Sequence, residues 1–339
     1  MRTSIHGLEE MALIKKIITI GLLVSVAAGG YFAWWAQKPI IGDEIEAIEF
    51  TIAPGSGAHA AGLQMAEAGI PMEPLLFNVL ARVTASSGKL KAGSYELKPG
   101  TTPLRLIEQL VKGEFAQEAL TIIEGWTFHQ MRQAMAVHKG LKHDTVALSD
   151  KEVMAQVDAD FKQPEGLFFP DTYLFPKGTS DLQIFKQAHA MLLTRLNEAW
   201  DRRDPSLPYK SPYEALTMAS IVEKETGQKS ERGMIAGVFV NRLKIGMLLQ
   251  TDPTVIYGMG NKYDGKIHKK DLETDTPYNT YTRAGLPPTP IALPGVQSLA
   301  AALAPAKTQA LYFVSKGNGT SQFSDNLTDH NRAVNQYQR

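Results

Sequence analysis

The hydrophobic pattern of this chain begins with a long uncharged stretch near the N-terminus. Residues 17–37 read IITIGLLVSVAAGGYFAWWAQ and contain no charged side chain. At about 1.5 Å per residue, a helix of this length covers roughly 30 Å, the thickness of a bilayer core. The pattern therefore predicts a transmembrane anchor at residues 17–37. A cleaved signal peptide is the alternative, because small residues occur around positions 27–30.

The charges on either side of this stretch predict its orientation. Lys15 and Lys16 precede it, and four acidic residues follow it within residues 43–49. Because positively charged flanks stay in the cytoplasm, residues 1–16 are expected there and the rest of the chain outside it. Trp34 and Trp35 lie where an interfacial aromatic belt is expected.

A local pattern then repeats twice. Residues 50–65 (FTIAPGSGAHAAGLQM) and 95–110 (YELKPGTTPLRLIEQL) each run aromatic-x-aliphatic-x-Pro-Gly-Ser/Thr before an apolar-periodic segment. The alternating part predicts a strand, Pro-Gly a turn, and the hydroxyl residue a cap for the helix that follows. A looser copy covers 120–135. We predict a small α+β module at 45–120, either a spacer or a polymer-binding module.

The second half of the chain predicts a larger α+β domain over residues 121–339. Helices are expected at 182–200, 212–226 and 231–244, a short one starts at 251 or 252, and a hairpin follows around a Gly-Asn-Gly turn. The helix at 212–226 has the best-marked ends. Ser211 is its expected N-cap, Glu214 completes a capping box, and Gly227 ends it.

Composition narrows the chemistry. Lys+Arg and Asp+Glu balance at 35 each, so a nucleic-acid partner is not expected. The absence of cysteine from the sequence excludes disulfides, thiolate nucleophiles and Cys-based zinc sites. The eight histidines show no ligand spacing, so neither a metal nor a cofactor is predicted. Acid–base catalysis by Asp or Glu side chains is the kind of chemistry that remains.

Two glutamates, Glu223 and Glu225, stand at the end of the helix at 212–226. A general acid must keep its proton near neutral pH, which requires burial against apolar groups. Both residues flank the apolar stripe, so the helical wheel does not choose between them. Residues two apart point about 200° apart, so they cannot flank one glycosidic bond as a retaining pair does. One of them is expected to act as a solitary acid.

Four segments carry a resemblance to a known family. They are TMASIVEKET (217–226), VFVNRLKIGMLLQTDPTVIYGMG (238–260), TPYNTYTRAGLPPTPIALPG (276–295) and PAKTQALYFVSKGNG (305–319). In this order they resemble the bacterial endolytic murein transglycosylase family, also called YceG-like or MltG. The resemblance implies a single membrane span, a LysM-like module at 45–120 and an α+β catalytic domain at 121–339.

The resemblance also implies an activity and a location. Members cleave nascent peptidoglycan strands between N-acetylmuramic acid and N-acetylglucosamine, leave 1,6-anhydro-muramyl ends and so terminate strand elongation. The protein is then expected in the bacterial inner membrane, with its C-terminal domain in the periplasm and penicillin-binding proteins as neighbours. No cofactor is implied. A muramidase that uses water and a non-catalytic peptidoglycan-binding scaffold are the alternatives, and the chemical ends of the product distinguish the three.

The resemblance implies that the first glutamate of VEKE, Glu223, is the catalytic residue. It would protonate the glycosidic oxygen and then take the proton from the sugar's own 6-hydroxyl. By motif, the substrate-binding candidates are Gln250, Asp252, Asn279, Tyr281 and Glu165. The plain alternatives are a helix cap for Asp252, a turn-stabilising role for Asn279 and a core position for Tyr281. Residues 321–334 match the family's C-terminal segment only loosely, which puts a functional role of His330 in doubt.

Overall fold

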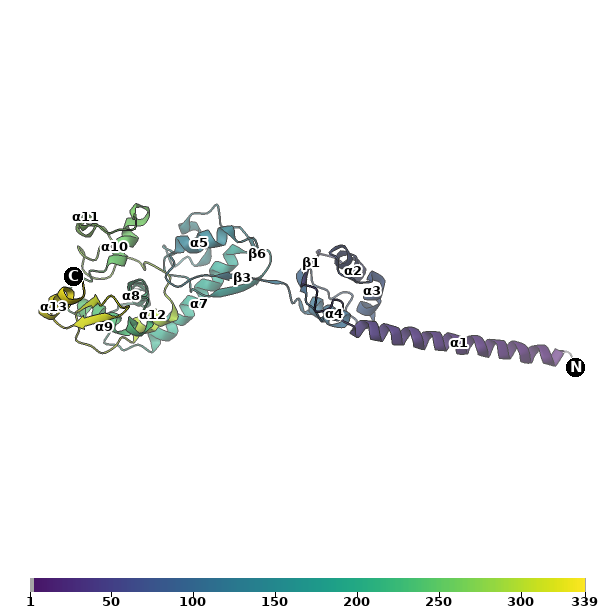
Figure 1. Cartoon of the computed structure of the whole chain (residues 1–339). Helices are drawn as coiled ribbons and strands as arrows, with labels where there is room; N and C mark the ends of the chain where they lie inside the picture. Colours follow the sequence, from purple (N-terminus) through teal and green to yellow (C-terminus); the bar gives the residue numbers. More distant parts are fainter. Residues whose placement is uncertain (1–2, 339) are drawn as a thin grey trace. The chain divides into compact units, whose positions relative to one another are not determined.

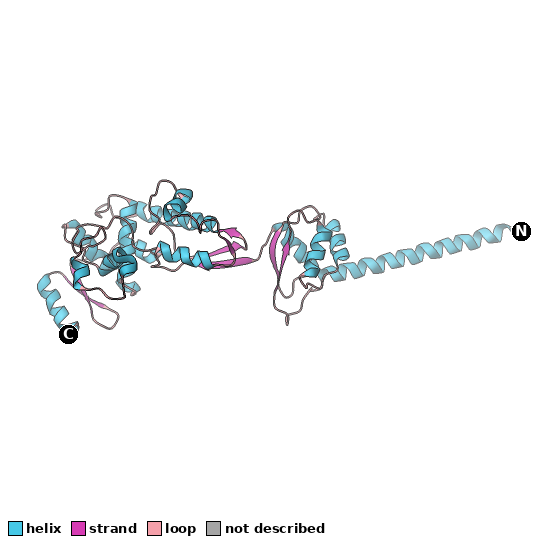
Figure 2. Cartoon of the chain, turned by 90° about the horizontal axis from the view of Figure 1, so that it is seen from above, coloured by secondary structure: helices cyan, strands magenta, loops and turns pink. Residues whose placement is uncertain are grey.

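The computed structural model describes residues 3–338, with side-chain surroundings from residue 13 onward. The chain divides into two compact units, with the boundary between Glu118 and Ala119. Both units mix helices with short strands, and helices dominate (Figures 1 and 2). The mixed α and β composition expected from the sequence is confirmed.

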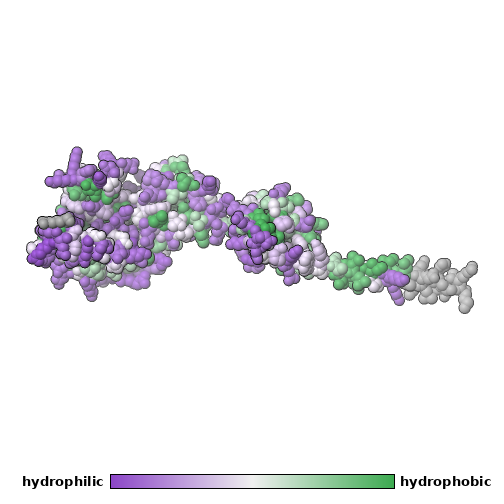
Figure 3. Space-filling view, in the orientation of Figure 1, coloured by the Kyte–Doolittle hydropathy of each residue, from purple (hydrophilic) through white to green (hydrophobic). Residues whose placement is uncertain are grey.

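The N-terminal helix α1 (Thr3–Gln37) is longer than the predicted span. Its segment Leu13–Gln37 is long and apolar enough to cross a membrane, as either an anchor or a signal sequence would be. Most side chains of this segment are exposed, and Figure 3 shows the hydrophobic colour along it. At its C-terminal end, Phe32, Trp35 and Ala36 pack against the core of the first unit. Trp35 is therefore partly buried against this core, unlike a residue of the predicted interfacial aromatic belt. Trp34 is exposed.

The rest of the first unit is a two-stranded antiparallel sheet covered by helices. Strands β1 (Ile48–Ile52) and β2 (Gly93–Leu97) pair with Phe50 opposite Tyr95, and these two rings stack at 5.6 Å. The helices are α2 (Ala58–Glu67), α3 (Pro74–Val83) and α4 (Pro103–Lys112). Buried apolar residues of all three helices complete the core.

The two strand–turn–helix repeats predicted from the sequence are present in this unit. Each Pro-Gly turn places its glycine in the left-handed region, with φ of +80° at Gly55 and +77° at Gly100, which explains why glycine is used there. The caps differ between the copies. Thr102 caps α4 by accepting from the Arg105 N–H, whereas α2 begins after Gly57 without a side-chain cap.

The remaining elements belong to the second unit, except that β3 begins two residues before the boundary. Its strands form three two-stranded pairs, β3–β5, parallel β4–β6 and antiparallel β7–β8. The elements in chain order are β3 (Gln117–Thr121), α5 (Phe128–Val137), β4 (Leu141–Lys142), α6 (Asp150–Val157), β5 (Thr172–Pro176), β6 (Thr179–Ser180), α7 (Asp181–Asp201), α8 (Pro212–Glu225), η1 (Lys229–Glu231), α9 (Arg232–Lys244), α10 (Asp252–Met259), η2 (Gly260–Lys262), α11 (Lys269–Glu273), α12 (Val296–Leu303), β7 (Tyr312–Ser315), β8 (Ser321–Ser324) and α13 (Leu327–Tyr337).

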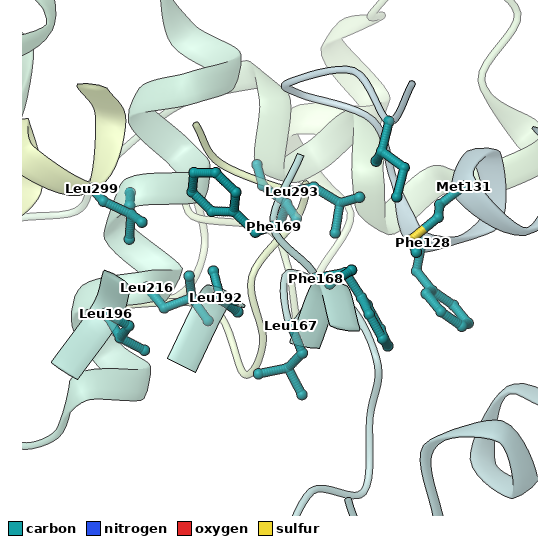
Figure 4. Packing of buried hydrophobic residues seen from close by; sticks show 14 of the residues in the cluster. Phe128, Met131, Leu167, Phe168, Phe169, Leu192, Leu196, Leu216, Leu293 and Leu299 are labelled. Atoms are coloured by element: carbon teal, nitrogen blue, oxygen red, sulfur yellow. The ribbon is translucent and has the colours of Figure 1, made fainter. Parts of the chain in front are cut away.

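Helix α8 occupies the centre of the second unit. Its residues 215–222 are all buried, and it packs on α7, α9, α10 and α12. Figure 4 shows the core beside it, with Leu216 near Leu192 and Leu196. A helix that is apolar on every side must be enclosed by other elements. The chain around it therefore fixes the position of its C-terminal turn.

The ends of α8 follow the sequence prediction closely. Ser211 caps the helix by accepting from the Glu214 N–H at 3.3 Å. In the predicted capping box, the Glu214 carboxylate would accept from the N–H of Ser211. In the structure it accepts instead from the N–H of the preceding residue, Lys210, at 2.7 Å. The predicted helices that follow are also present, as α9 and α10, and the predicted hairpin forms from β7 and β8.

Candidate active site

A cavity of about 950 Å³ opens at the C-terminal end of α8, entirely within the second unit. Its volume falls in the range of about 300–1,000 Å³ that is usual for ligand sites. One part of its wall comes from the end of α8, the start of α10 and Tyr281. The other part comes from the β7–β8 hairpin and α13. Of the candidates singled out in the sequence, Gln250, Asp252 and Tyr281 line the cavity, and so does Glu225.

Glu225 is half-buried and presents its carboxyl group to this cavity. Its Oε2 accepts a hydrogen bond from the Thr251 hydroxyl at 2.5 Å. Burial raises the pKa of Glu225 above its ordinary value, and the nearby Asp252 charge adds to the rise. The Thr251 hydrogen bond and the positive charge of Arg242 oppose it. The net effect raises the pKa of Glu225, which is the direction that a general acid requires to hold its proton closer to neutral pH.

Glu223 has different surroundings. Its Oε1 accepts from Arg232 Nη2 at 2.9 Å, and its Oε2 accepts from the Ser298 hydroxyl at 2.7 Å and the Gly295 N–H at 2.9 Å. The side chains of Glu223 and Arg232 are only 5% and 7% exposed. Both carboxylate oxygens are thus occupied by donors from α9 and the start of α12. Glu223 and Arg232 therefore form a buried ion pair.

Asp252 and Tyr281 form a polar pair in the cavity wall. The Tyr281 hydroxyl donates to Asp252 Oδ1 at 2.6 Å. Asp252 is the first residue of α10, and the N-cap of this helix is Thr251, not Asp252. Neighbouring Gln250 has φ of +50°, in the left-handed region that non-glycine residues seldom adopt. Strained backbone of this kind is concentrated at functional sites.

Asn279 lies behind the cavity wall and is only 1% exposed. Its amide donates to three backbone carbonyls, those of Asp271, Leu272 and Thr274, at 3.2, 3.0 and 2.7 Å. Its Oδ1 accepts from the Tyr281 N–H at 2.9 Å. The contacts match the turn-stabilising alternative, and through them Asn279 positions Tyr281.

Glu165 forms a buried link between α5 and α10. Its carboxylate accepts from the Phe128 N–H at 3.0 Å, at the first turn of α5, and from the Tyr257 hydroxyl at 3.1 Å. Burial raises the pKa of Glu165 to about 7, although these two hydrogen bonds oppose the rise. The side chain is only 7% exposed, so its partners are these protein groups.

Sequence reasoning did not single out Thr251 and Arg242 as site residues. Thr251 lies inside the segment 238–260, but the sequence does not show that its hydroxyl donates a hydrogen bond to Glu225. Arg242 donates to the carbonyls of Leu311 and Leu249 at 2.7 and 2.5 Å. No sequence signal points to it, because both partners are backbone groups.

Comparisons with known proteins agree with this architecture. A model of the YceG-like family matches residues 50–336. The endolytic murein transglycosylase of Bacillus subtilis (strain 168) is 34% identical over 333 residues, which cover 91% of this chain and 90% of that protein. The protein of the same name from Streptococcus pneumoniae is 28% identical over 360 residues, covering 94% of this chain and 65% of that one.

The fold has a counterpart among solved structures. The crystal structure of a yceG-like protein from Listeria monocytogenes aligns with a TM-score of 0.53 and 32% identity, over 85% of this chain and 99% of that one. The resemblance noted in the four sequence motifs is thereby confirmed. With its family model spanning most of both units, this chain belongs to the YceG-like family.

Proposed function

We propose that this chain is a membrane-anchored lytic transglycosylase that cleaves peptidoglycan glycan strands within the strand. The observation that carries the proposal is Glu225, a half-buried residue whose carboxyl group has a raised pKa, in the wall of a cavity large enough for a saccharide chain. Two relatives that are named endolytic murein transglycosylases, similar over most of this chain, support the same activity.

The reaction follows from one carboxyl group. Protonated Glu225 donates its proton to the glycosidic oxygen as the bond between that oxygen and C1 of N-acetylmuramic acid breaks. The Glu225 carboxylate then accepts the proton of the sugar's 6-hydroxyl while that oxygen bonds to C1. The product carries a 1,6-anhydro end, and Glu225 is protonated again. No water is consumed and no second carboxylate is needed.

The Asp252–Tyr281 pair stabilises the charged centre in this scheme. Positive charge develops at C1 as the bond breaks, and a carboxylate in the cavity wall lowers its energy. Asp252 also contributes to the raised pKa of Glu225. Tyr281 holds Asp252 by its 2.6 Å hydrogen bond, and Asn279 holds the backbone of Tyr281.

The resemblance implied Glu223 as the catalytic residue, and our proposal assigns the acid to Glu225 instead. The physical reason is that both oxygens of Glu223 are engaged by Arg232, Ser298 and Gly295. In the proposed scheme, Glu223 anchors the C-terminal turn of α8 to α9 and α12. Glu225 then keeps a fixed place in the cavity wall.

The remaining proposals concern location. We propose that α1 is retained as an inner-membrane anchor, that the second unit acts in the periplasm, and that residues 45–120 form a LysM-like glycan-binding module. The length of the uncharged run at residues 17–37, which is enough to span a bilayer core, supports retention. Cleavage of nascent strands would terminate elongation beside penicillin-binding proteins.

The test uses the full-length protein in detergent micelles with uncrosslinked glycan strands, and mass spectrometry of the new ends. Ends lighter by one water are expected from the wild type. Glu225→Gln should fold normally and lose activity by about 100-fold or more, the usual contribution of a general acid. Glu223→Gln is the comparison variant: its amide nitrogen cannot accept the hydrogen bonds that one carboxylate oxygen accepts, so it should lose stability but keep far more activity than Glu225→Gln.

Each other outcome contradicts a stated part of the scheme. Ordinary reducing ends would make the protein a muramidase, and no new ends would favour the scaffold. Loss of cleavage in Glu223→Gln with activity retained in Glu225→Gln would return the acid to Glu223.

A further inference from the structure

The hairpin and C-terminal helix bring two aromatic rings together in the wall of the same cavity. Tyr312 on β7 and His330 on α13 stack with ring centroids 5.1 Å apart and planes at 24°. Both residues line the cavity that contains Glu225. Figures 1 and 2 show the hairpin and α13 side by side at the C-terminus. The proposed reaction uses neither residue.

The hydrogen bonding of His330 leaves one ring nitrogen for a ligand. Among the described residues, its Nδ1 has no hydrogen-bond partner and is closed off from solvent. Burying a bare nitrogen costs less than burying an unpaired N–H, so the neutral tautomer with hydrogen on Nε2 is favoured. Burial and the charge of Arg242 lower the pKa of His330, which keeps the ring neutral. The Nε2–H group is then a donor, and no protein group within the described part of the chain accepts a hydrogen bond from it.

Tyr312 is held firmly in place. The guanidinium of Arg242 lies 5.4 Å from the centre of its ring. Arg242 itself is fixed by its hydrogen bonds to the carbonyls of Leu311 and Leu249. The strand neighbours of Tyr312 are anchored too, because Val314 is buried and Phe313 packs edge-on against Phe239. The ring pair is therefore a preorganised surface, which lowers the entropic cost of binding.

The two charged side chains near the ring pair already have hydrogen-bond partners within the protein. Glu231 accepts from the Ser321 N–H and hydroxyl at 2.7 and 2.8 Å. Arg242 is engaged by two carbonyls and the Tyr312 ring, as described above. The other polar side chains that line this wall are neutral, namely Ser315, Thr320, Ser321, Asn331 and Gln338. A wall of flat rings bordered by neutral hydrogen-bonding groups suits a pyranose ring with hydroxyl and acetamide substituents better than the carboxylates of a stem peptide.

We propose that Tyr312 and His330 form a saccharide subsite that binds an N-acetylated sugar of the glycan strand, adjacent to the sugars whose bond is cleaved. The apolar face of the sugar packs on the ring pair, and His330 Nε2–H donates to a hydroxyl or to the acetamide carbonyl. The inference rests on the proposed function and adds a binding role for the C-terminal wall of the cavity.

The test measures binding separately from cleavage. Full-length protein carrying Glu225→Gln, in detergent micelles, is titrated with uncrosslinked glycan strands freed of stem peptides. His330→Ala and Tyr312→Ala should each weaken Kd roughly tenfold, which corresponds to about 1.4 kcal/mol of lost contact. Tyr312→Phe, which keeps the ring, should stay within about twofold. His143→Ala, at an exposed histidine of the same unit, is the matched control and should leave Kd unchanged.

Activity measurements supply the second readout. In the protein with Glu225 intact, His330→Ala should raise KM while kcat changes little, because the subsite binds the strand equally before and during bond cleavage. His330 is half-buried on α13, so this variant is expected to fold even if Tyr312→Ala does not.

Three results would overturn the subsite. They are unchanged Kd in His330→Ala, loss confined to kcat, and, in a parallel titration with strands that keep their stem peptides, loss of affinity for those strands alone. Failure of the proposed function would look different, because cleavage by Glu225→Gln would reveal it whatever the binding result.

Discussion

Glu165 provides a quantitative test of how burial controls a carboxyl group in this fold. It is 7% exposed and accepts hydrogen bonds from the Phe128 N–H and the Tyr257 hydroxyl. The perturbation is Glu165→Gln, which keeps the shape and an acceptor oxygen but removes the ability to ionise. The two proteins should therefore differ in how their stability depends on pH.

The expected magnitude follows from the pKa. Glu165 ionises near 4.5 in the unfolded chain and near 7 in the folded protein, because burial disfavours its charge. Between these values the folded protein holds a proton that the unfolded chain has released, so stability falls as pH rises. At 1.36 kcal/mol per pKa unit, the raised pKa of Glu165 lowers the free energy of unfolding by about 3 kcal/mol at high pH. From about pH 5 to about pH 8 it grows by about 2.5 kcal/mol.

The assay is urea unfolding of the full-length protein and of Glu165→Gln, followed by tryptophan fluorescence at these two pH values. Relative to the wild type, the variant should gain about 2.5 kcal/mol of stability between about pH 5 and about pH 8. His143→Ala is a control that should follow the wild type at both. A stability difference between wild type and Glu165→Gln that is independent of pH would show that Glu165 ionises normally, and the reasoning from burial would be wrong.

Three further substitutions test other contacts. Glu223→Ala leaves Arg232 buried and unpaired and should cost about 3–5 kcal/mol in urea unfolding, whereas a loss under about 1 kcal/mol would show that the ion pair is solvated. Asn279→Ala leaves three backbone carbonyls without their donor and should cost about 2–3 kcal/mol and raise KM, while unchanged stability with raised KM would indicate direct substrate contact instead. Gly166→Ala should lower Tm and cost at least about 2 kcal/mol, since Gly166 has φ of +79° and a methyl there would lie 2.3 Å from Cβ of Pro290; an unchanged Tm would contradict this geometry.

Much of the fold was predictable because its signals are local. The uncharged run at residues 17–37 predicted the apolar part of α1. Ser211, Pro212 and Gly227 marked the ends of α8 to within a residue. The two Pro-Gly turns marked the strand–turn–helix units of the first unit, where Gly55 and Gly100 adopt positive φ. Caps, turns and periodicity depend on neighbouring residues, so one sequence is enough to predict them.

The candidate site was only partly predictable. Three residues that the motifs singled out, Gln250, Asp252 and Tyr281, lie in the wall of one cavity. They also singled out Asn279 and Glu165, whose contacts in the structure are with buried backbone and side-chain groups. A motif marks residues that matter, but the partner of each side chain comes from another element. The motif therefore does not distinguish contact with substrate from support behind it.

The sequence by itself determined that one glutamate of the pair at the end of α8 could act as a solitary acid, and it predicted the helix that carries both. Only the tertiary structure distinguished their surroundings. Glu223 meets Ser298, 75 positions away, and the Arg232 guanidinium, whereas Glu225 meets a hydroxyl in the wall of a cavity. The same holds for His330, whose stacking partner lies on the hairpin. The ionisation and accessibility of a side chain depend on the atoms packed around it, and folding brings those atoms from distant parts of the chain.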